Sequence, residues 1–104
     1  MIEQVYKLTL SDQKTVEKVV HDENVQYMHM VFNEGQGTPE HYSNSTVYMT
    51  VIRGTLSITL GEQGTKEYEA GTVLKIPLNT KMKAENRGKN TLELIVVKAP
   101  SPEK

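Results

Sequence analysis

The sequence has 104 residues, which suits one domain with a modest hydrophobic core. Its 12 lysines and arginines nearly balance 13 aspartates and glutamates, and this net charge of -1 lacks the basic excess of nucleic-acid-binding proteins. The chain has no cysteine, no signal-peptide pattern and no apolar run of about 18 residues, so we expect a cytoplasmic protein without disulfides, thiolate metal sites, or nucleic-acid or membrane partners.

The chain alternates between short segments of strand character and turns. The range 5–10 has strand character, whereas 15–20 also fits a short helix capped by Ser11, although its β-branched residues favour a strand. Asn79 suits a turn position with positive φ. Further strands are expected at 25–32, 46–52, 55–60, 65–69, 73–76, 81–86 and 91–98. Residues 99–104 contain two prolines and are expected to form a tail.

This pattern indicates an all-β fold. Short strands with turn signals every 8–12 residues or so are typical of a sandwich or barrel. An α/β fold would need crossover helices of about a dozen residues, for which the chain has no room. No repeat or linker divides the sequence, so we expect one domain spanning residues 1–104.

The stretch 35–54 carries a recognisable spacing of turn and polar residues. Gly35 is followed after five residues by His41, and Ser43 lies two positions beyond that histidine. Val47 lies seven residues before Gly54. This stretch resembles the first motif of the cupin superfamily, which runs Gly, five residues, His-x-His, three or four residues, Glu, six residues, Gly. His41 falls on the first histidine, Ser43 on the second, and Val47 on the glutamate.

A second stretch resembles the other cupin motif, which runs Gly, five residues, Pro-x-Gly, two residues, His, three residues, Asn. Gly71, Pro77 and Asn86 fall on the matching positions. Asn79 replaces a glycine, and Met82 occupies the histidine position. The two motifs span residues 35–86, about half of the chain. The resemblance implies a single cupin domain, a small double-stranded β-helix (jelly-roll) barrel, and a homodimer, as small cupins often are.

The resemblance first implies a metal-binding function. Cupin metal sites are similar to the histidine and carboxylate spheres that hold iron, manganese, nickel or zinc. Of the four implied ligands only His41 is retained. Val47 has no lone pair, the Met82 thioether is too soft for hard divalent ions, and the Ser43 hydroxyl is a poor ligand unless deprotonated. We therefore expect no conventional four-ligand metal site and no cofactor.

Two other metal sites stay open. His29 precedes the first motif and could join His41 and a glutamate in a nonstandard site, although a satisfied side chain on a strand face is the favoured interpretation. His41 with Met82 and Met49 would suit Cu(I) better than iron. Methionines inside a barrel, however, usually fill the core.

The remaining residues favour a binding function. A histidine can donate or accept hydrogen bonds near neutral pH, and a barrel mouth lined by apolar side chains with a few polar groups suits a small molecule. We expect such a ligand to bind in the barrel mouth without the four-ligand metal site. The candidate pocket residues are His41, Ser43, Val47, Met49, Met82 and Asn86, of which Asn86 also suits a turn-closing role. The simpler interpretation is that the apolar residues fill a vacated site.

Two functions of other classes compete with this interpretation. One is a metal-dependent enzyme of the oxygenase, isomerase or epimerase type that uses His41 with His29. The other is a regulatory or interaction module whose dimer surface is the functional part. No Ser-His-Asp spacing or phosphate-binding loop occurs in the sequence, and no catalytic residue can be assigned.

Overall fold

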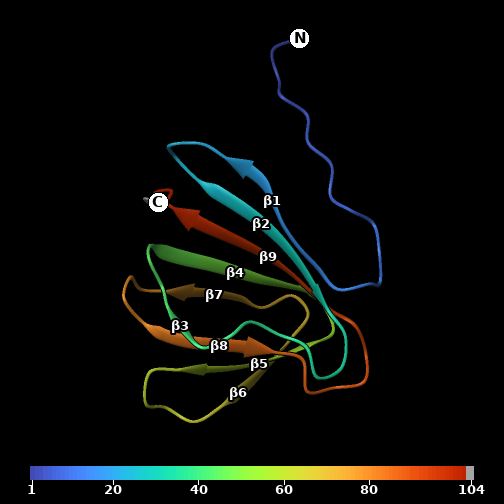
Figure 1. Ribbon diagram of the computed structural model, residues 1–104, viewed down its shortest axis with the longest axis vertical. Helices are drawn as coiled ribbons and strands as arrows, with labels where there is room; N and C mark the ends of the chain where they lie inside the picture. The colour runs from blue at the N-terminus through green and yellow to red at the C-terminus, as the bar shows by residue number, and fades with distance from the viewer. Residues whose placement is uncertain (103–104) are drawn as a thin grey trace.

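The computed structural model describes residues 1–102, and regular structure within that range consists of strands alone. The strands are β1 Thr15–His21, β2 Gln26–Phe32, β3 His41–Tyr42, β4 Thr46–Arg53, β5 Thr55–Leu60, β6 Lys66–Glu69, β7 Val73–Ile76, β8 Lys81–Glu85 and β9 Leu92–Ala99. They form two antiparallel sheets, in the orders β1-β2-β9-β4-β7 and β3-β8-β5-β6 (Figure 1). Residues 1–102 contain no apolar helix long enough to cross a membrane.

The core lies between the inner faces of the two sheets. On β4, Val47 and Val51 are buried, whereas Tyr48 and Ile52 on the other face are exposed. This alternation follows from the two-residue period of a strand, which sends successive side chains to opposite faces. The buried side chains form one cluster, to which Phe32, Leu56, Ile58, Leu92 and Leu94 contribute large apolar groups. The all-β barrel expected from the sequence is thereby confirmed.

Two of the turns show why particular residues occupy them. Asn79 has a φ of 65°, as its place in the Pro77–Thr80 turn predicts. Gly54 joins β4 to β5 with a φ of 81°, and a Cβ atom there would lie 2.4 Å from the carbonyl oxygen of Thr91. A side chain at this position would therefore be strained by its backbone conformation and would also clash with the neighbouring backbone.

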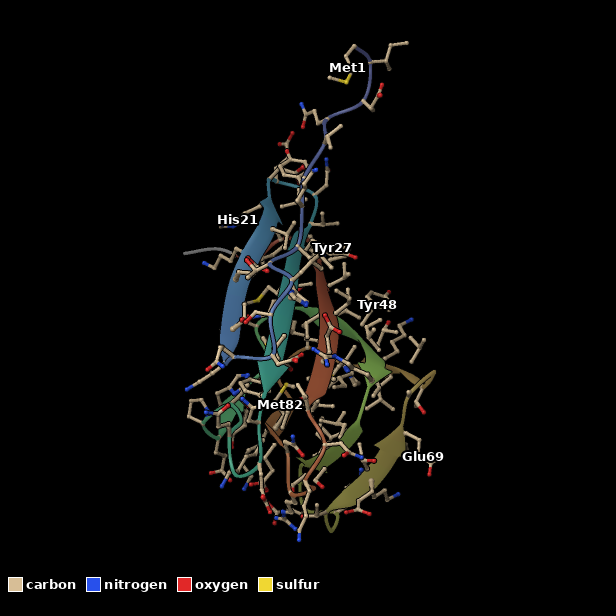
Figure 2. The ribbon with its side chains drawn as sticks, turned by 90° about the vertical axis from the view of Figure 1, so that its right-hand side faces the viewer. Met1, His21, Tyr27, Tyr48, Glu69 and Met82 are labelled. Carbon is tan, nitrogen blue, oxygen red and sulfur yellow. The ribbon has the colours of Figure 1, made fainter. Side chains whose placement is uncertain are left out.

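The structure differs from the sequence-based expectation at the N-terminus. The range 5–10 forms no strand. Figure 2 shows the N-terminal segment along the outer side of β1 and β2, with Met1 beyond the end of the sheet that carries His21. Side-chain anchors explain this path. Glu17 accepts hydrogen bonds from the backbone and hydroxyl of Thr9, and Asp12 pairs with Arg53, so the segment crosses the sheet face instead of extending its edge.

The C-terminus also differs in detail. Strand β9 continues to Ala99, which pairs with Thr46, so the expected tail 99–104 begins one residue later. The carbonyl of Pro100 then accepts a hydrogen bond from the Ser45 hydroxyl. Residues 103 and 104 of the tail lie outside the described residues. Segment 100–102 thus packs beside the loop that leads into β4.

Candidate ligand-binding site

His41 lies on the inner side of the four-stranded sheet. It pairs with the buried Met82 across β3 and β8, and directly opposed residues share a sheet face. Its Nδ1 lies 2.8 Å from the carbonyl oxygen of Pro39 and must donate to it, because a carbonyl only accepts. Nε2 is the remaining ring nitrogen, and the side chain is only partly buried. His41 can therefore offer one nitrogen to a small molecule.

Ser43 has a structural role in the turn between β7 and β8. Its buried hydroxyl donates to the Pro77 carbonyl at 2.7 Å and accepts from the Thr80 backbone nitrogen at 2.8 Å. Its backbone also pairs with Thr80 and Asn79. Both hydroxyl functions are thus used within the turn. The Ser43 side chain fixes the loop and has little left for a ligand.

The other candidate pocket residues are packed into the barrel. Val47, Met49 and Met82 are 1%, 2% and 4% exposed and belong to the apolar core. Asn86 is 1% exposed, and its amide nitrogen donates to the carbonyls of Phe32 and Asn90 at 2.9 and 2.8 Å. Its side-chain oxygen accepts from the Gly88 backbone nitrogen, so Asn86 closes the turn between β8 and β9.

The motif positions therefore do not fit a divalent metal ion. His41 supplies the single imidazole, the Ser43 hydroxyl is engaged by the backbone, and Val47 and Met82 supply no hard donor. Within residues 1–102, no three His, Asp or Glu side chains are arranged to hold a metal ion.

His29 lies on the opposite side of the five-stranded sheet from the core. Its neighbours Met28 and Met30 point inward, so His29 points outward, where it is nonetheless fully buried. Nδ1 lies 2.7 Å from a Glu17 carboxylate oxygen and Nε2 lies 2.6 Å from one of Glu93. The structure does not bring His29 and His41 together, and both ring nitrogens of His29 are already bonded.

Hydrogen bonds around His29 lower the pKa of both neighbouring carboxylates. The hydrogen bond from His29, followed by those from Thr9, lowers the pKa of Glu17 to about 2. Burial alone would raise the pKa of Glu93, but hydrogen bonds from His29 and Arg53 outweigh it and lower the pKa. The two ring nitrogens of His29 therefore link a carboxylate of β1 to a carboxylate of β9.

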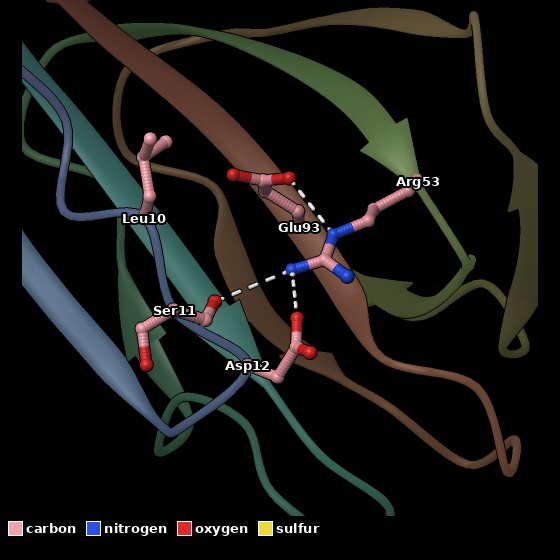
Figure 3. A pocket seen from close by; sticks show the side chains of 5 residues that line it. All are labelled: Leu10, Ser11, Asp12, Arg53 and Glu93. Atoms are coloured by element: carbon pink, nitrogen blue, oxygen red, sulfur yellow. Dashed lines mark hydrogen bonds and ion pairs between the residues drawn. The ribbon is translucent and has the colours of Figure 1, made fainter.

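This network continues into a hollow on the outer side of the sheet. The hollow, of about 410 Å³, is lined by Leu10, Ser11, Asp12, Arg53 and Glu93 (Figure 3). The Arg53 guanidinium lies 2.8 Å from the Asp12 carboxylate and 2.9 Å from that of Glu93. The Arg53 cation is therefore paired with two carboxylates. The charged groups of this hollow already form ion pairs with one another.

A different hollow lies at the end of the barrel where β9 finishes and β4 begins. Its volume is about 230 Å³, and its lining consists of Lys18, His21, Gln26, Met28, Asn44, Lys98 and Pro102. Lys98 pairs with Gln26 on one side and with the buried Val47 on the other, so its side chain shares their inner face. We call this hollow the Lys98 pocket. It lies at the end of the core, beside Met28.

The Lys98 pocket is polar and positively charged. Burial, and secondarily the nearby charge of Lys18, lowers the pKa of Lys98. The Lys98 ammonium lies 3.4 Å from the Asn44 side-chain oxygen. In the part of the chain that the structure describes, no carboxylate lies within 4.0 Å of the Lys18 or Lys98 ammonium. Among residues 1–102, the cationic groups of this pocket therefore have no acidic partners like those around Arg53.

A neighbouring hollow of about 330 Å³ lies across segment 100–102 and shares Asn44 and Pro102 with the Lys98 pocket. Ser101 lines this hollow, and its buried hydroxyl has no hydrogen-bond partner among residues 1–102.

The sequence contained a signal for the Lys98 pocket that the motif comparison missed. Leu94, Val96 and Lys98 occupy alternate positions of one strand, and the first two are buried. A lysine that continues an inward-facing apolar row is expected to reach the end of the core. The second cupin motif ends at Asn86, so the two motifs do not include this strand.

Comparison with known proteins agrees with the fold and the motifs. Residues 28–98 match the sequence model of a family described as "Cupin domain". An uncharacterised protein of Methanocaldococcus jannaschii is 42% identical over 105 residues, which cover 100% of this chain and 90% of that protein. The chain therefore belongs to the cupin family.

Solved structures give the same result. The crystal structure of the M. jannaschii protein is described as an RmlC-like cupin-family protein with a double-stranded β-helix fold. It superposes with a TM-score of 0.94, covering 98% of this chain and 94% of that one. A cupin-superfamily protein from Desulfitobacterium hafniense has a TM-score of 0.75 at 15% identity over 89% and 83% of the two chains. The second match concerns the fold alone.

Proposed function

We propose that this cupin binds a small molecule at the mouth of its barrel, without a conventional four-ligand metal site. The observation that carries the proposal is the Lys98 pocket, where inward-facing polar side chains meet an open hollow of about 230 Å³. Concave sites with an apolar floor and a few polar groups are typical of small-molecule binding. Met28 supplies apolar floor, and Gln26, Asn44 and Lys98 supply polar groups.

In this proposal the motif positions keep the barrel intact and do not contact the ligand. Val47, Met49 and Met82 fill the core, and Ser43 and Asn86 close turns. His41 is the exception, because it keeps an available nitrogen beside Met82. Replacing it separates the two regions: binding at the Lys98 pocket survives His41→Ala, whereas binding at the motif positions does not.

Amide chemical shifts recorded during titration with small molecules test this proposal. We expect butyrate and butyramide, as short charged and neutral probes, to shift the amides of Gln26, Asn44 and Lys98 in a saturable way. The amide of Ile58, which lies in the core of the other sheet, serves as an internal control. If neither probe gives saturable shifts at the mouth, or if His41→Ala abolishes them, the proposed site is wrong.

We also propose that the chain forms a homodimer through the outer face of the five-stranded sheet. Tyr48, Ile52 and Val73 are 37%, 47% and 63% exposed there, and Val5 and Tyr6 of the N-terminal segment add exposed apolar surface. Such surface favours association. Sedimentation equilibrium at micromolar concentration should give twice the 11.7 kDa chain mass, and a monomer would contradict the dimer.

A further inference from the structure

We propose that the ligand of the Lys98 pocket is a small organic anion, with a carboxylate held by Lys98 and a short apolar body over Met28. This inference rests on the proposed binding function and specifies the chemical class of its ligand. It follows from the position of the charged groups, from the polar side chains that line the hollow beside them, and from the size of the hollow.

The position of Lys98 is the first argument. Its side chain follows Leu94 and Val96 on the inner face of β9, so the ammonium is drawn toward the barrel end instead of projecting from the outer face. Removing a charge from water is unfavourable unless a counter-charge accompanies it. No carboxylate among residues 1–102 provides one within 4.0 Å. A bound carboxylate would supply this counter-charge.

Other donors lie around the same hollow. Lys18 pairs with Met28 across β1 and β2, which places a second ammonium group on the same side, and His21 pairs with Gln26. Gln26 is 4% exposed as a residue, and it lines the hollow beside His21 and Lys98. Its nitrogen can donate to a ligand oxygen.

The arrangement of Asn44 fits the same ligand. Its side-chain oxygen lies 3.4 Å from the Lys98 ammonium, so it can orient the ammonium without neutralising it. Asn44 precedes β4 in the loop that borders the hollow. Among the described residues, the lining thus combines two lysines with neutral polar groups and contains no acidic side chain.

The size of the hollow limits the ligand. A volume of about 230 Å³ corresponds to roughly eight water-sized volumes. Met28, which is 8% exposed, forms an apolar part of the wall. A carboxylate with a short aliphatic chain fits these dimensions and can place its chain against the methionine.

The Arg53 hollow provides a contrast within the same molecule. It is larger, at about 410 Å³, but its guanidinium is bonded to Asp12 and Glu93. An incoming anion would have to displace one of these carboxylates. The Lys98 pocket requires no such exchange among the described residues, so an anion is expected to prefer it.

Calorimetric and amide-shift titrations with butyrate, butyramide and inorganic phosphate test the charge preference. The proposal predicts that butyrate binds at least about tenfold more tightly than the neutral butyramide, because hydrogen bonds to charged groups are the stronger ones. Lys98→Met keeps the apolar stem and removes the charge. It should weaken butyrate binding about tenfold or more and leave butyramide binding within about twofold. Phosphate binding as tight as that of butyrate would show that the apolar wall contributes nothing and would overturn the short-chain assignment.

Two controls make the outcomes distinct. Lys66→Met removes an exposed lysine of β6 and should leave butyrate binding unchanged. A chain ending at Pro102 with an amidated C-terminus, which carries no terminal carboxylate beside the pocket, should bind butyrate as the full chain does. If only the shortened chain binds, a terminal carboxylate of the protein occupies the pocket and the anion proposal fails. Equal binding of butyrate and butyramide, unaffected by Lys98→Met, would overturn the anion class but keep the binding site. Binding of neither probe would overturn the proposed function itself.

Discussion

We expect His29→Leu to lower the free energy of unfolding by about 3 kcal/mol, because it removes two hydrogen bonds to partly buried carboxylates. His29 is fully buried, and its partners Glu17 and Glu93 have side chains only 26% and 17% exposed. Leucine fills a similar volume but removes the hydrogen bonds that the His29 ring makes with both carboxylates. Glu93 keeps Arg53 and Glu17 keeps Thr9, which limits the loss. Urea unfolding at pH 7, followed by circular dichroism, measures the effect.

The controls for this prediction lie on the same sheet. His21→Leu changes an exposed histidine of β1 and should alter the unfolding free energy by less than about 0.5 kcal/mol. The double variant Glu17→Gln/His29→Leu should recover part of the loss, because it no longer leaves the Glu17 charge without its partner. A His29→Leu protein within about 1 kcal/mol of the parent would show that the network contributes little.

The second prediction with a large effect is a loss of folding stability at acidic pH. The pKa of Glu17 is lowered from 4.5 to about 2 in the folded protein, so the folded state binds its proton less readily than the unfolded state. The resulting stabilisation is complete above pH 4.5 or so and is lost as the pH falls toward about 2. At 1.4 kcal/mol per pKa unit, and with a discount for solvent screening of a side chain 26% exposed, we expect a loss of about 1–3 kcal/mol. The lowered pKa of Glu93 acts in the same direction.

Unfolding free energies at pH 7, 4 and 2.5 test this acid dependence. Glu17→Gln removes the titrating group and should flatten part of the curve, whereas Glu23→Gln, in the exposed turn between β1 and β2, should not. Parallel curves for the parent and Glu17→Gln would contradict the assignment. A flat parent curve between pH 4.5 and 2 would contradict it as well.

Much of the fold could be predicted because it depends on local patterns. Leu56, Ile58 and Leu60 show the alternation of a half-buried strand, and the expected range 55–60 matches β5. Asn79 was placed correctly at a positive φ from its position between turn residues. The spacing of Gly35, Pro77 and Asn86 indicated the family, because these positions shape the turns that the barrel needs.

The features that sequence reasoning missed depend on contacts between distant residues. Glu17 and Glu93 lie 12 and 64 positions from His29, and no local pattern brings them together. Segment 5–10 has strand character but is held across a sheet face by the side chain of Glu17. Whether Val47, Met49 and Met82 would line a cavity or fill it depended on how closely the two sheets approach, which alternation does not specify.

A crystal structure of the protein with butyrate tests the central claim most directly, because it shows where the ligand lies. The account predicts a carboxylate about 2.7–3.2 Å from the Lys98 ammonium, with the aliphatic chain beside Met28 and no contact with Val47 or Met82. A butyrate bound at His41, with the Lys98 pocket holding only water, would contradict it.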